Sequence, residues 1–400
     1  MKLRNLIAVA LIGFATPRLI AKSSNVVAES PKDSAATKQE VPSVMYQFLG
    51  HIMELQPYMT SEKSFAIPKS RKSIQFHLDQ LEKLSHSLHH YDRLKTPNFH
   101  ISAQLLEEEL QEAASSYRKS NFSYSRRMLN QSLYGCGSCH MQISPSDNPQ
   151  WKFDASKIKG SAYERAEFLF ATRQYDQSLK LYNSIIDSFD KRATDEGSFE
   201  LEKSIKRIIG IGIRIKRDPS TTSASVARVT KLEKAPEALK KDASLWSAQL
   251  TALQSIKKID AKTVTADQLI NYVATKVQLE DEKPAIGDDQ MILALYLSGL
   301  LYDYINSHPD TQLKAGILYW LGVLDSRVDD SFQYDLSNLY LRECILRFPK
   351  DPVARACYRE VEEQTLLSYT GSSGINVPDD VRADLDQLRG LIDKSALNKK

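Results

Sequence analysis

The chain has 400 residues, of which 42% are hydrophobic and 26% charged, and its formal net charge is only +3. This composition is ordinary for a soluble globular protein, and the length favours two or three domains. Lysine and arginine are not concentrated into a stripe interleaved with aromatic residues, which argues against a nucleic-acid partner.

The first 21 residues have the pattern of a secretory signal peptide. A basic start is followed by a short apolar core at residues 6–14 and by small residues that allow cleavage after Ala15 or Ala21. That core is shorter than the about 20 residues that cross a bilayer, so we expect no membrane segment after cleavage. Residues 22–41 are polar and aperiodic, as in a flexible linker. These features predict export to the periplasm of a Gram-negative bacterium.

Residues 42–145 are expected to form an all-α, up-down-up-down four-helix bundle, because turn residues separate four helical stretches with short connections. In the third stretch, apolar and acidic residues lie mostly on opposite faces: Ile101, Leu105, Leu106 and Leu110 against Glu107, Glu108, Glu109 and Glu112. The expected helices cover approximately Ser43–Met59, Lys69–His90, Pro97–Lys119 and Ser123–Met141.

The last of these stretches ends in Cys136-Gly137-Ser138-Cys139-His140, the C-x-x-C-H spacing of covalent c-type haem attachment. Two thiols at this spacing add to the two vinyl groups of the porphyrin, and the imidazole that follows lies under the iron. A zinc site needs about four ligands, and Cys344 and Cys357 do not form a suitable second pair. A thioredoxin-like motif would follow a strand, whereas the pattern here is helical. We therefore predict one covalent haem c held by Cys136 and Cys139, with His140 as an axial iron ligand.

A haem motif near the end of a fourth helix resembles the cytochrome c-prime family. Residues 129–140 are similar to the closing helix of that family and residues 45–53 to its opening helix, so the resemblance covers about a quarter of the chain. The resemblance implies a haem-binding four-helix bundle. The family commonly has a basic residue four positions after the haem histidine, and Ser144 at that position puts any role of the base in doubt here.

The second axial ligand is left open by the motif. In an antiparallel bundle the candidates at the same end as His140 are Met45, His86, His89, His90 and His100. Met53 lies about 12 Å further along its helix than Met45, and His77 lies towards the middle of its own. Met45 is favoured by the resemblance, since the methionine-ligated branch of the family has its distal ligand there, whereas the five-coordinate branch has an apolar residue that does not bind iron.

Residues 157–395 have helical periodicity with few strand signals. Two segments resemble tetratricopeptide repeats: Ala166 to Ala171 followed by Tyr175, Ser178, Tyr182 and Ile185, and more loosely Tyr319 to Gly322 followed by Tyr340, Cys344, Pro349 and Pro352. The resemblance implies an irregular helical-repeat scaffold that binds a protein, with a non-repeat helical domain as the alternative. Cys344 and Cys357 are expected to pack as small apolar residues, although a disulfide is possible in an oxidising compartment.

Together these features predict an exported monohaem cytochrome that transfers electrons, with the helical-repeat domain docking it to redox partner proteins. No nucleophile-and-base constellation or phosphate-binding loop is evident, so catalysis is not expected. The alternative is a haem-based gas-binding or sensory protein with an open distal site, and the coordination number of the iron distinguishes the two. The electron donor and acceptor and the oligomeric state, a dimer included, are left open.

Overall fold

The computed structural model describes residues 41–91, 97–141, 155–191, 197–280, 283–285, 290–308, 310–328, 332, 336–372 and 374–397. Within these ranges the chain is all-α, as predicted, with sixteen α-helices and two small β-hairpins. The predicted signal peptide, nearly all of the predicted linker and most of the segment between the two predicted domains lie outside the described residues. None of the described helices is long and apolar enough to cross a membrane.

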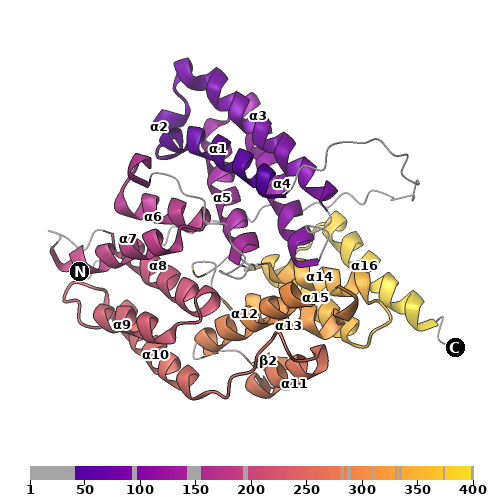
Figure 1. Ribbon diagram of the computed structural model, residues 1–400. Coiled ribbons are helices and arrows are strands. Elements are labelled where there is room, and N and C mark those ends of the chain that lie inside the picture. The colour runs from indigo at the N-terminus through magenta and orange to yellow at the C-terminus, as the bar shows by residue number, and fades with distance from the viewer. Residues whose placement is uncertain are drawn as a thin grey trace, which may run out of the picture.

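The N-terminal helices form the upper part of the molecule in Figure 1. They are α1 (Val41–Met59), α2 (Glu62–Phe65), α3 (Arg71–Ser87), α4 (Pro97–Arg118) and α5 (Phe122–Met141), with short 3-10 helices at Pro68–Ser70 and Leu88–His90. The four long helices lie where the sequence predicted them, and the short α2 was not predicted. A tight turn in which Ser120 has a φ of 62° lets α5 fold back along α4, and the Ser125 hydroxyl donates to the Ala113 carbonyl across the pair at 2.7 Å.

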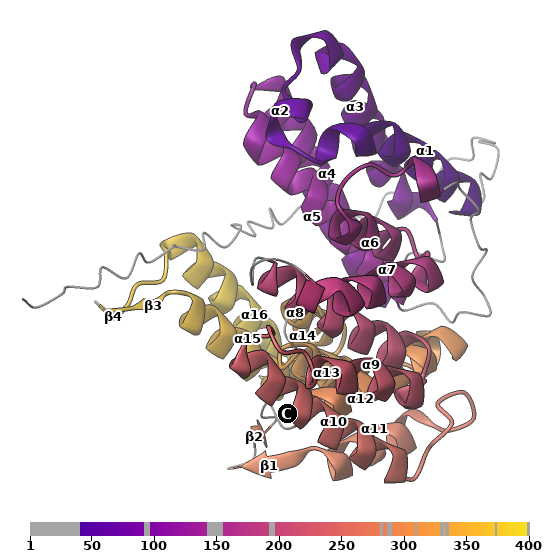
Figure 2. The same cartoon turned by 90° about the vertical axis from the view of Figure 1, so that its left-hand side faces the viewer.

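The remaining helices pack largely against their neighbours in the chain (Figure 2). They are α6 (Ala162–Ala171), α7 (Tyr175–Ser188), α8 (Ser198–Ile209), α9 (Pro219–Val229), α10 (Glu237–Ser255), α11 (Ala266–Lys276), α12 (Met291–Ser307), α13 (Ala315–Asp325), α14 (Ser337–Arg347), α15 (Val353–Ser368) and α16 (Asp379–Leu397). A π-helix, Gly210–Ile215, continues α8, and 3-10 helices cover Ala155–Lys157, Phe189–Lys191 and Asp310–Gln312.

Two short antiparallel hairpins interrupt the helices, and the sequence did not predict either. Strand β1 (Gln278–Glu280) pairs with β2 (Lys283–Ala285), and β3 (Thr370–Gly371) pairs with β4 (Gly374–Ile375). Each strand has only two or three residues, so a run long enough to show the alternation of a strand is absent.

Helix α6 belongs to both hydrophobic cores of the molecule. Its residues Phe168, Leu169 and Ala171 lie in the core of α1 to α5, whereas Ala166 and Phe170 lie in the larger core of the later helices. The C-terminal half of α6, residues 166–171, is buried on every side because it packs between these two cores. The side chain of Gln56 also makes two hydrogen bonds to the backbone of Lys159, at 2.7 and 2.9 Å. The helices before and after residues 142–154 are therefore in direct contact.

A buried ion pair joins α6, α7 and α8. The guanidinium of Arg207 donates to both carboxylate oxygens of Glu167, at 3.1 and 3.2 Å, and the hydroxyl of Tyr182 donates to the same carboxylate. Burial raises the pKa of Tyr182 well above its ordinary value, and the negative charge of Glu167 adds to the effect. The hydroxyl therefore remains a donor, and the carboxylate is satisfied from two helices.

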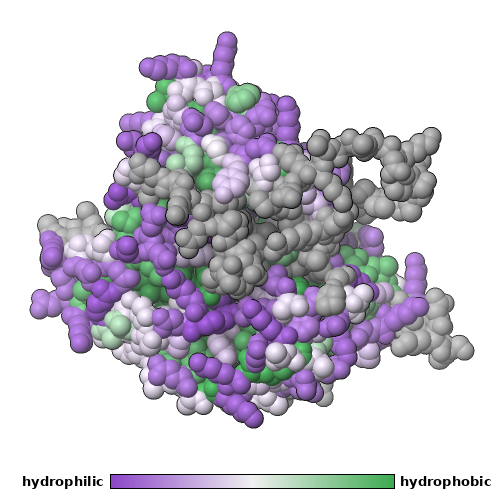
Figure 3. Space-filling view, in the orientation of Figure 1, coloured by the Kyte–Doolittle hydropathy of each residue, from purple (hydrophilic) through white to green (hydrophobic). Residues whose placement is uncertain are grey.

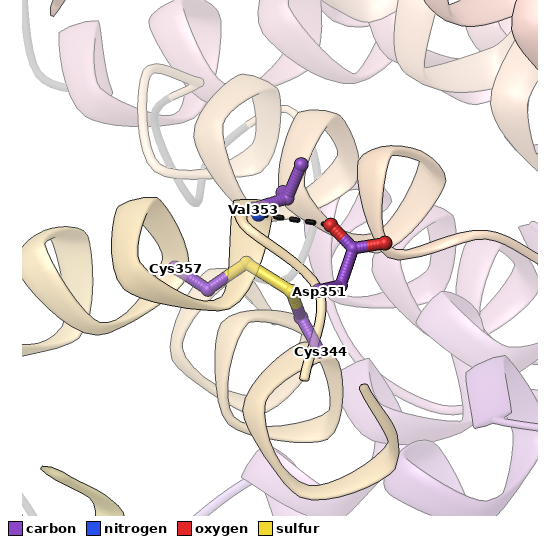
Figure 4. The surroundings of a disulfide bond; sticks show 4 residues. All are labelled: Cys344, Asp351, Val353 and Cys357. Carbon is purple, nitrogen blue, oxygen red and sulfur yellow. Dashed lines mark hydrogen bonds between the residues drawn. A yellow bond between two sulfur atoms is a disulfide. The ribbon is translucent and has the colours of Figure 1, made fainter. Parts of the chain in front are cut away.

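The structure corrects one expectation about the cysteines. Cys344 in the last turn of α14 and Cys357 in the second turn of α15 form a disulfide, with their Cα atoms 6.5 Å apart (Figure 4). The short connection between these helices is held by the Asp351 carboxylate, which accepts a hydrogen bond from the Val353 amide at 2.9 Å. It turns α15 back beside α14 and places the two cysteines opposite one another. The favoured expectation of unpaired, packed cysteines was therefore wrong, and the disulfide that the sequence left as the alternative is formed.

Candidate haem site

The C-x-x-C-H motif lies in the last turns of α5, which is helical through Met141. Each residue of an α-helix advances about 100° around the axis, so positions 136, 139 and 140 fall within an arc of about 100°. The helix therefore presents the two cysteine positions and the histidine position on one side. The side chains of Cys139 and His140 lie outside the described residues, so their contacts are not part of this description.

Cys136 is half-buried and packs against the core of α1 to α5. The same end of this core is apolar: Phe99, Leu106 and Leu133 are each at most 9% exposed. An apolar, nearly water-free wall is what the hydrophobic faces of a porphyrin require, because burying them removes apolar surface from water. The described residues near Cys136 are thus apolar, as a covalently held porphyrin would require.

Met45 lies in the second turn of α1, half-buried against the same core as Cys136. The guanidinium of Arg126 donates to the carbonyl of Met59 at 2.6 Å and ties the end of α1 to the start of α5. Met45 and position 140 are each fourteen residues from this contact, which is about 21 Å along either helix. Met53 also packs half-buried against this core.

The histidines at the end of α3 are held by a carboxylate of α4. Glu107 accepts hydrogen bonds from His86 at 2.7 Å and from His89 at 2.5 Å. Partial burial raises the pKa of Glu107, but the two histidine hydrogen bonds outweigh it and hold that pKa below its ordinary value. The ring of His90 lies edge-on to that of His86. The side chain of His100 is outside the described residues.

Glu109 departs from the expected pattern of α4. Its side chain was predicted on the polar face, but the residue is only 3% exposed. A Cβ atom on Gly135 would lie 3.3 Å from the Glu109 carboxylate, so the glycine next to Cys136 leaves room for it. The helical spacing contained this information, since position 109 lies three and four residues from the apolar Leu106 and Leu105. A buried carboxylate that lies against Gly135, the residue just before the motif, is a site feature that was missed.

A second pair of histidines lies between α1 and α3. The Nδ1 atoms of His51 and His77 are 2.9 Å apart, and both residues are half-buried. Burial lowers the pKa of His51, and His77 lowers it further. Among the described side chains, no group of three or more His, Cys, Asp or Glu is arranged to hold a metal ion.

Comparison of the chain with protein-family models, with curated proteins and with solved structures gave no match. The function has to be argued from the residues themselves.

Proposed function

We propose that the chain is an exported monohaem c-type cytochrome that transfers electrons between protein partners. The observation that carries the proposal is the C-x-x-C-H spacing at the end of α5, where the helix brings both thiol positions and the imidazole position to one side. Cys136 and Cys139 would hold the porphyrin, and His140 would bind the iron from one face. When bound, the haem supplies a one-electron couple.

The protein groups around α5 have separate tasks in this proposal. In this proposal α1, α3, α4 and α5 would act as a bundle of the cytochrome c-prime kind, and the buried Phe99, Leu106 and Leu133 would help to exclude water from the porphyrin. The buried Glu109 places a carboxylate beside the attachment helix. If this carboxylate is ionised, its negative charge would stabilise the oxidised state of a bound haem, because ferric iron carries one more positive charge than ferrous iron.

Met45 is the second axial ligand in this proposal. Its half-buried side chain packs against the same core as Cys136. His86 and His89 already donate to Glu107, and the side chain of His86 is 76% exposed. A thioether ligand stabilises ferrous iron and raises the reduction potential.

The region after residue 157 acts as a tetratricopeptide-like scaffold that docks a protein partner. Helices α6 and α7 form the helix pair of the first repeat-like segment, and α13 and α14 that of the second. A groove of about 540 Å³ lies between α7, the π-helix and α9. It has the mixed lining of a surface that binds a polypeptide, including Leu179, Asn183, Asp187, Ile208, Thr221 and Ser225. Figure 3 shows a face on which hydrophilic residues predominate and hydrophobic residues are scattered in small groups.

Haem staining after denaturing electrophoresis tests the attachment. The full chain, made with the c-type maturation machinery, should give a stained band because the thioether bonds survive denaturation. The double variant Cys136→Ser/Cys139→Ser should be unstained. The matched control Cys344→Ser/Cys357→Ser should still be stained, since those cysteines form the disulfide of α14 and α15. An unstained band of exported wild-type protein would contradict the proposal.

The absorption spectrum separates electron transfer from gas binding. A low-spin, six-coordinate iron in both oxidation states, unreactive towards carbon monoxide, is the expected result. A high-spin, five-coordinate ferrous iron that binds carbon monoxide would instead favour the gas-binding function, since an open coordination position is what that function needs.

A further inference from the structure

Positive charge is concentrated at the end of helices α1 to α5 that lies farthest from the C-x-x-C-H motif. At this end α1 and α4 finish and α3 and α5 begin, in the upper part of Figure 1. Residues 60–72 and 118–127, which we call the basic end, contain eight Lys or Arg residues and a single carboxylate, Glu62. The whole chain has a formal net charge of only +3. The basic end is therefore more positive than the chain as a whole, although its cations come from separate segments of the sequence.

Three contacts hold the segments of the basic end together. The Tyr117 hydroxyl donates to the Phe65 carbonyl at 3.1 Å and joins α4 to α2. The guanidinium of Arg71 lies 4.6 Å from the centre of the Phe122 ring and joins the start of α3 to the start of α5. Arg126 joins α5 to the end of α1 through its hydrogen bond to a backbone carbonyl. The cations of these segments therefore share one surface of the folded protein.

Most of these cations are not neutralised within the protein. Lys63, Lys69, Lys72 and Lys119 are exposed, and no carboxylate of the described residues pairs with any of them. Arg118 is the exception, because two carboxylates of α3 accept from it at 2.7 and 2.9 Å. In Figure 3 the uppermost surface of the molecule is mostly hydrophilic. The four lysines are therefore available to an anionic partner.

The side chains of the basic end favour a lipid surface over a protein or a nucleic acid. Protein interfaces are depleted in lysine and have an apolar or aromatic centre. Here lysines supply the free charge, and the exposed large hydrophobic side chain among them is Ile67, which is 38% exposed and lies between Lys63 and Lys69 in the chain. The ring of Phe122 is half-buried beneath Arg71, so it is not free to stack on a base.

We propose that the basic end binds the anionic phospholipid surface of a membrane, with Ile67 entering the boundary between the headgroups and the acyl chains. Each lysine or arginine close to such a surface strengthens binding about five-fold, and an apolar side chain at the boundary adds to it. Position 140 is about 21 Å along α5 from Arg126, so the proposed haem site would remain away from the lipid. The binding does not depend on haem, so haem staining and membrane binding can fail separately.

Co-sedimentation of the full chain with lipid vesicles tests the proposal. The protein should bind vesicles that contain roughly 30% phosphatidylglycerol in phosphatidylcholine, and it should not bind vesicles of phosphatidylcholine alone. Sodium chloride at about 0.5 M should release it, because salt screens exposed charges. Inorganic phosphate at matched ionic strength should not release it. Release by phosphate would show a site for the free anion and would overturn the proposal.

Two variants that lose the same charge separate the basic end from general electrostatics. The test variant should bind the anionic vesicles at least about fifty-fold more weakly, and it carries Lys63→Gln, Lys69→Gln, Lys72→Gln and Lys119→Gln. The control should bind within about three-fold of the wild type, and it changes four exposed lysines of α10 and the segment after it: Lys241→Gln, Lys257→Gln, Lys258→Gln and Lys262→Gln. Ile67→Ser alone should weaken binding about five-fold.

Thermal melts establish that each variant is folded, which is expected because every lysine replaced is exposed. The proposal is overturned if the wild type binds neither kind of vesicle, or if it binds both equally. It is equally overturned if the test variant and the control lose the same amount of binding, because the position of the lysines would then not matter.

Discussion

Two methionines on α1 allow a clean test of the second axial ligand. Met45 and Met53 are both half-buried against the same core, but they lie two turns apart along the helix, or about 12 Å. Met45→Ala should convert a low-spin spectrum to a high-spin one and remove the sulfur-to-iron charge-transfer band. Met53→Ala should change neither. If both variants keep the wild-type spectrum, a histidine such as His89 becomes the better assignment, and His89→Ala should then produce the change.

The carboxylate of Glu107 makes the stability of the N-terminal helices depend on pH. The hydrogen bonds from His86 and His89 lower its pKa in the folded state. A carboxylate of lowered pKa stabilises the fold above its unfolded pKa, and this contribution is lost as the pH falls through the folded pKa. Glu107→Gln should therefore lower the free energy of unfolding by about 1–2 kcal/mol near pH 7. The difference from wild type should shrink as the pH falls below about 4.5.

Thermal melts of wild type and Glu107→Gln between pH 7 and pH 3 measure this dependence. Glu112→Gln is the control, since Glu112 is an exposed carboxylate on the same helix that accepts a hydrogen bond from the Ser116 hydroxyl rather than from a histidine. It should melt as the wild type does throughout. A constant difference between wild type and Glu107→Gln across the whole pH range would show that the effect is not electrostatic.

At the scale of the elements, the π-helix packs so closely against α9 that Gly212 leaves no room for a side chain. A Cβ atom on Gly212 would overlap the hydroxyl of Thr222, and the Thr222 Cβ would be only 3.1 Å away. Thr222 is buried and donates to the Asp218 carbonyl at 2.8 Å, so it cannot turn away. Gly212→Ala should therefore destabilise the protein by about 2–3 kcal/mol in chemical denaturation.

Two further variants isolate the cause. Gly212→Ala/Thr222→Ala should recover part of the loss, because the overlapping hydroxyl is gone. Gly50→Ala is the matched helical control: nothing lies within 4 Å of its added methyl group, and it should be neutral or stabilising by up to about 1 kcal/mol. If the changes in unfolding free energy of Gly212→Ala and of Thr222→Ala simply add in the double variant, the steric explanation is refuted.

For the whole molecule, the contacts of α6 determine which fragments fold well. A fragment of residues 41–145 leaves exposed the apolar surface that Phe168, Leu169 and Ile158 cover. A fragment of residues 41–191 keeps those side chains and the Gln56–Lys159 hydrogen bonds. The longer fragment should be more stable by at least about 3 kcal/mol. Thermal melts followed by circular dichroism decide this, and equal stabilities would mean that residues 42–145 form a self-sufficient domain.

The helices were easier to predict than the contacts between them. In residues 42–145 the apolar period and the flanking proline, serine and asparagine residues located each long helix to within a few residues. The same reasoning named the Cys344–Cys357 disulfide only as the less favoured alternative, and it missed both hairpins and the dual role of α6. The hairpin strands are too short to show an alternating pattern. The disulfide and the dual role of α6 depend on how helices pack, and the apolar period of one helix does not record that.

Some features of the candidate site could likewise be predicted from the sequence, and others could not. Cys136, Cys139 and His140 could be predicted as a haem-attachment motif because the chemistry of attachment fixes their spacing along the chain. The pair His51–His77 was not found, since its members are 26 residues apart and their meeting depends on how α1 packs on α3. Met45 stays a prediction that its position against the core supports.

The position of α6 has a consequence for how the molecule opens. Local unfolding exposes backbone amides to exchange with solvent, and each region exchanges at the free energy of the smallest opening that reaches it. Residues 166–171 of α6 are all buried and are divided between the two cores. If α16 or a β-hairpin unfolds locally, residues 166–171 remain buried. Their amides should therefore be among the last to take up deuterium, at a rate that follows global unfolding, whereas exchange at the rate of α16 would show that the cores separate first.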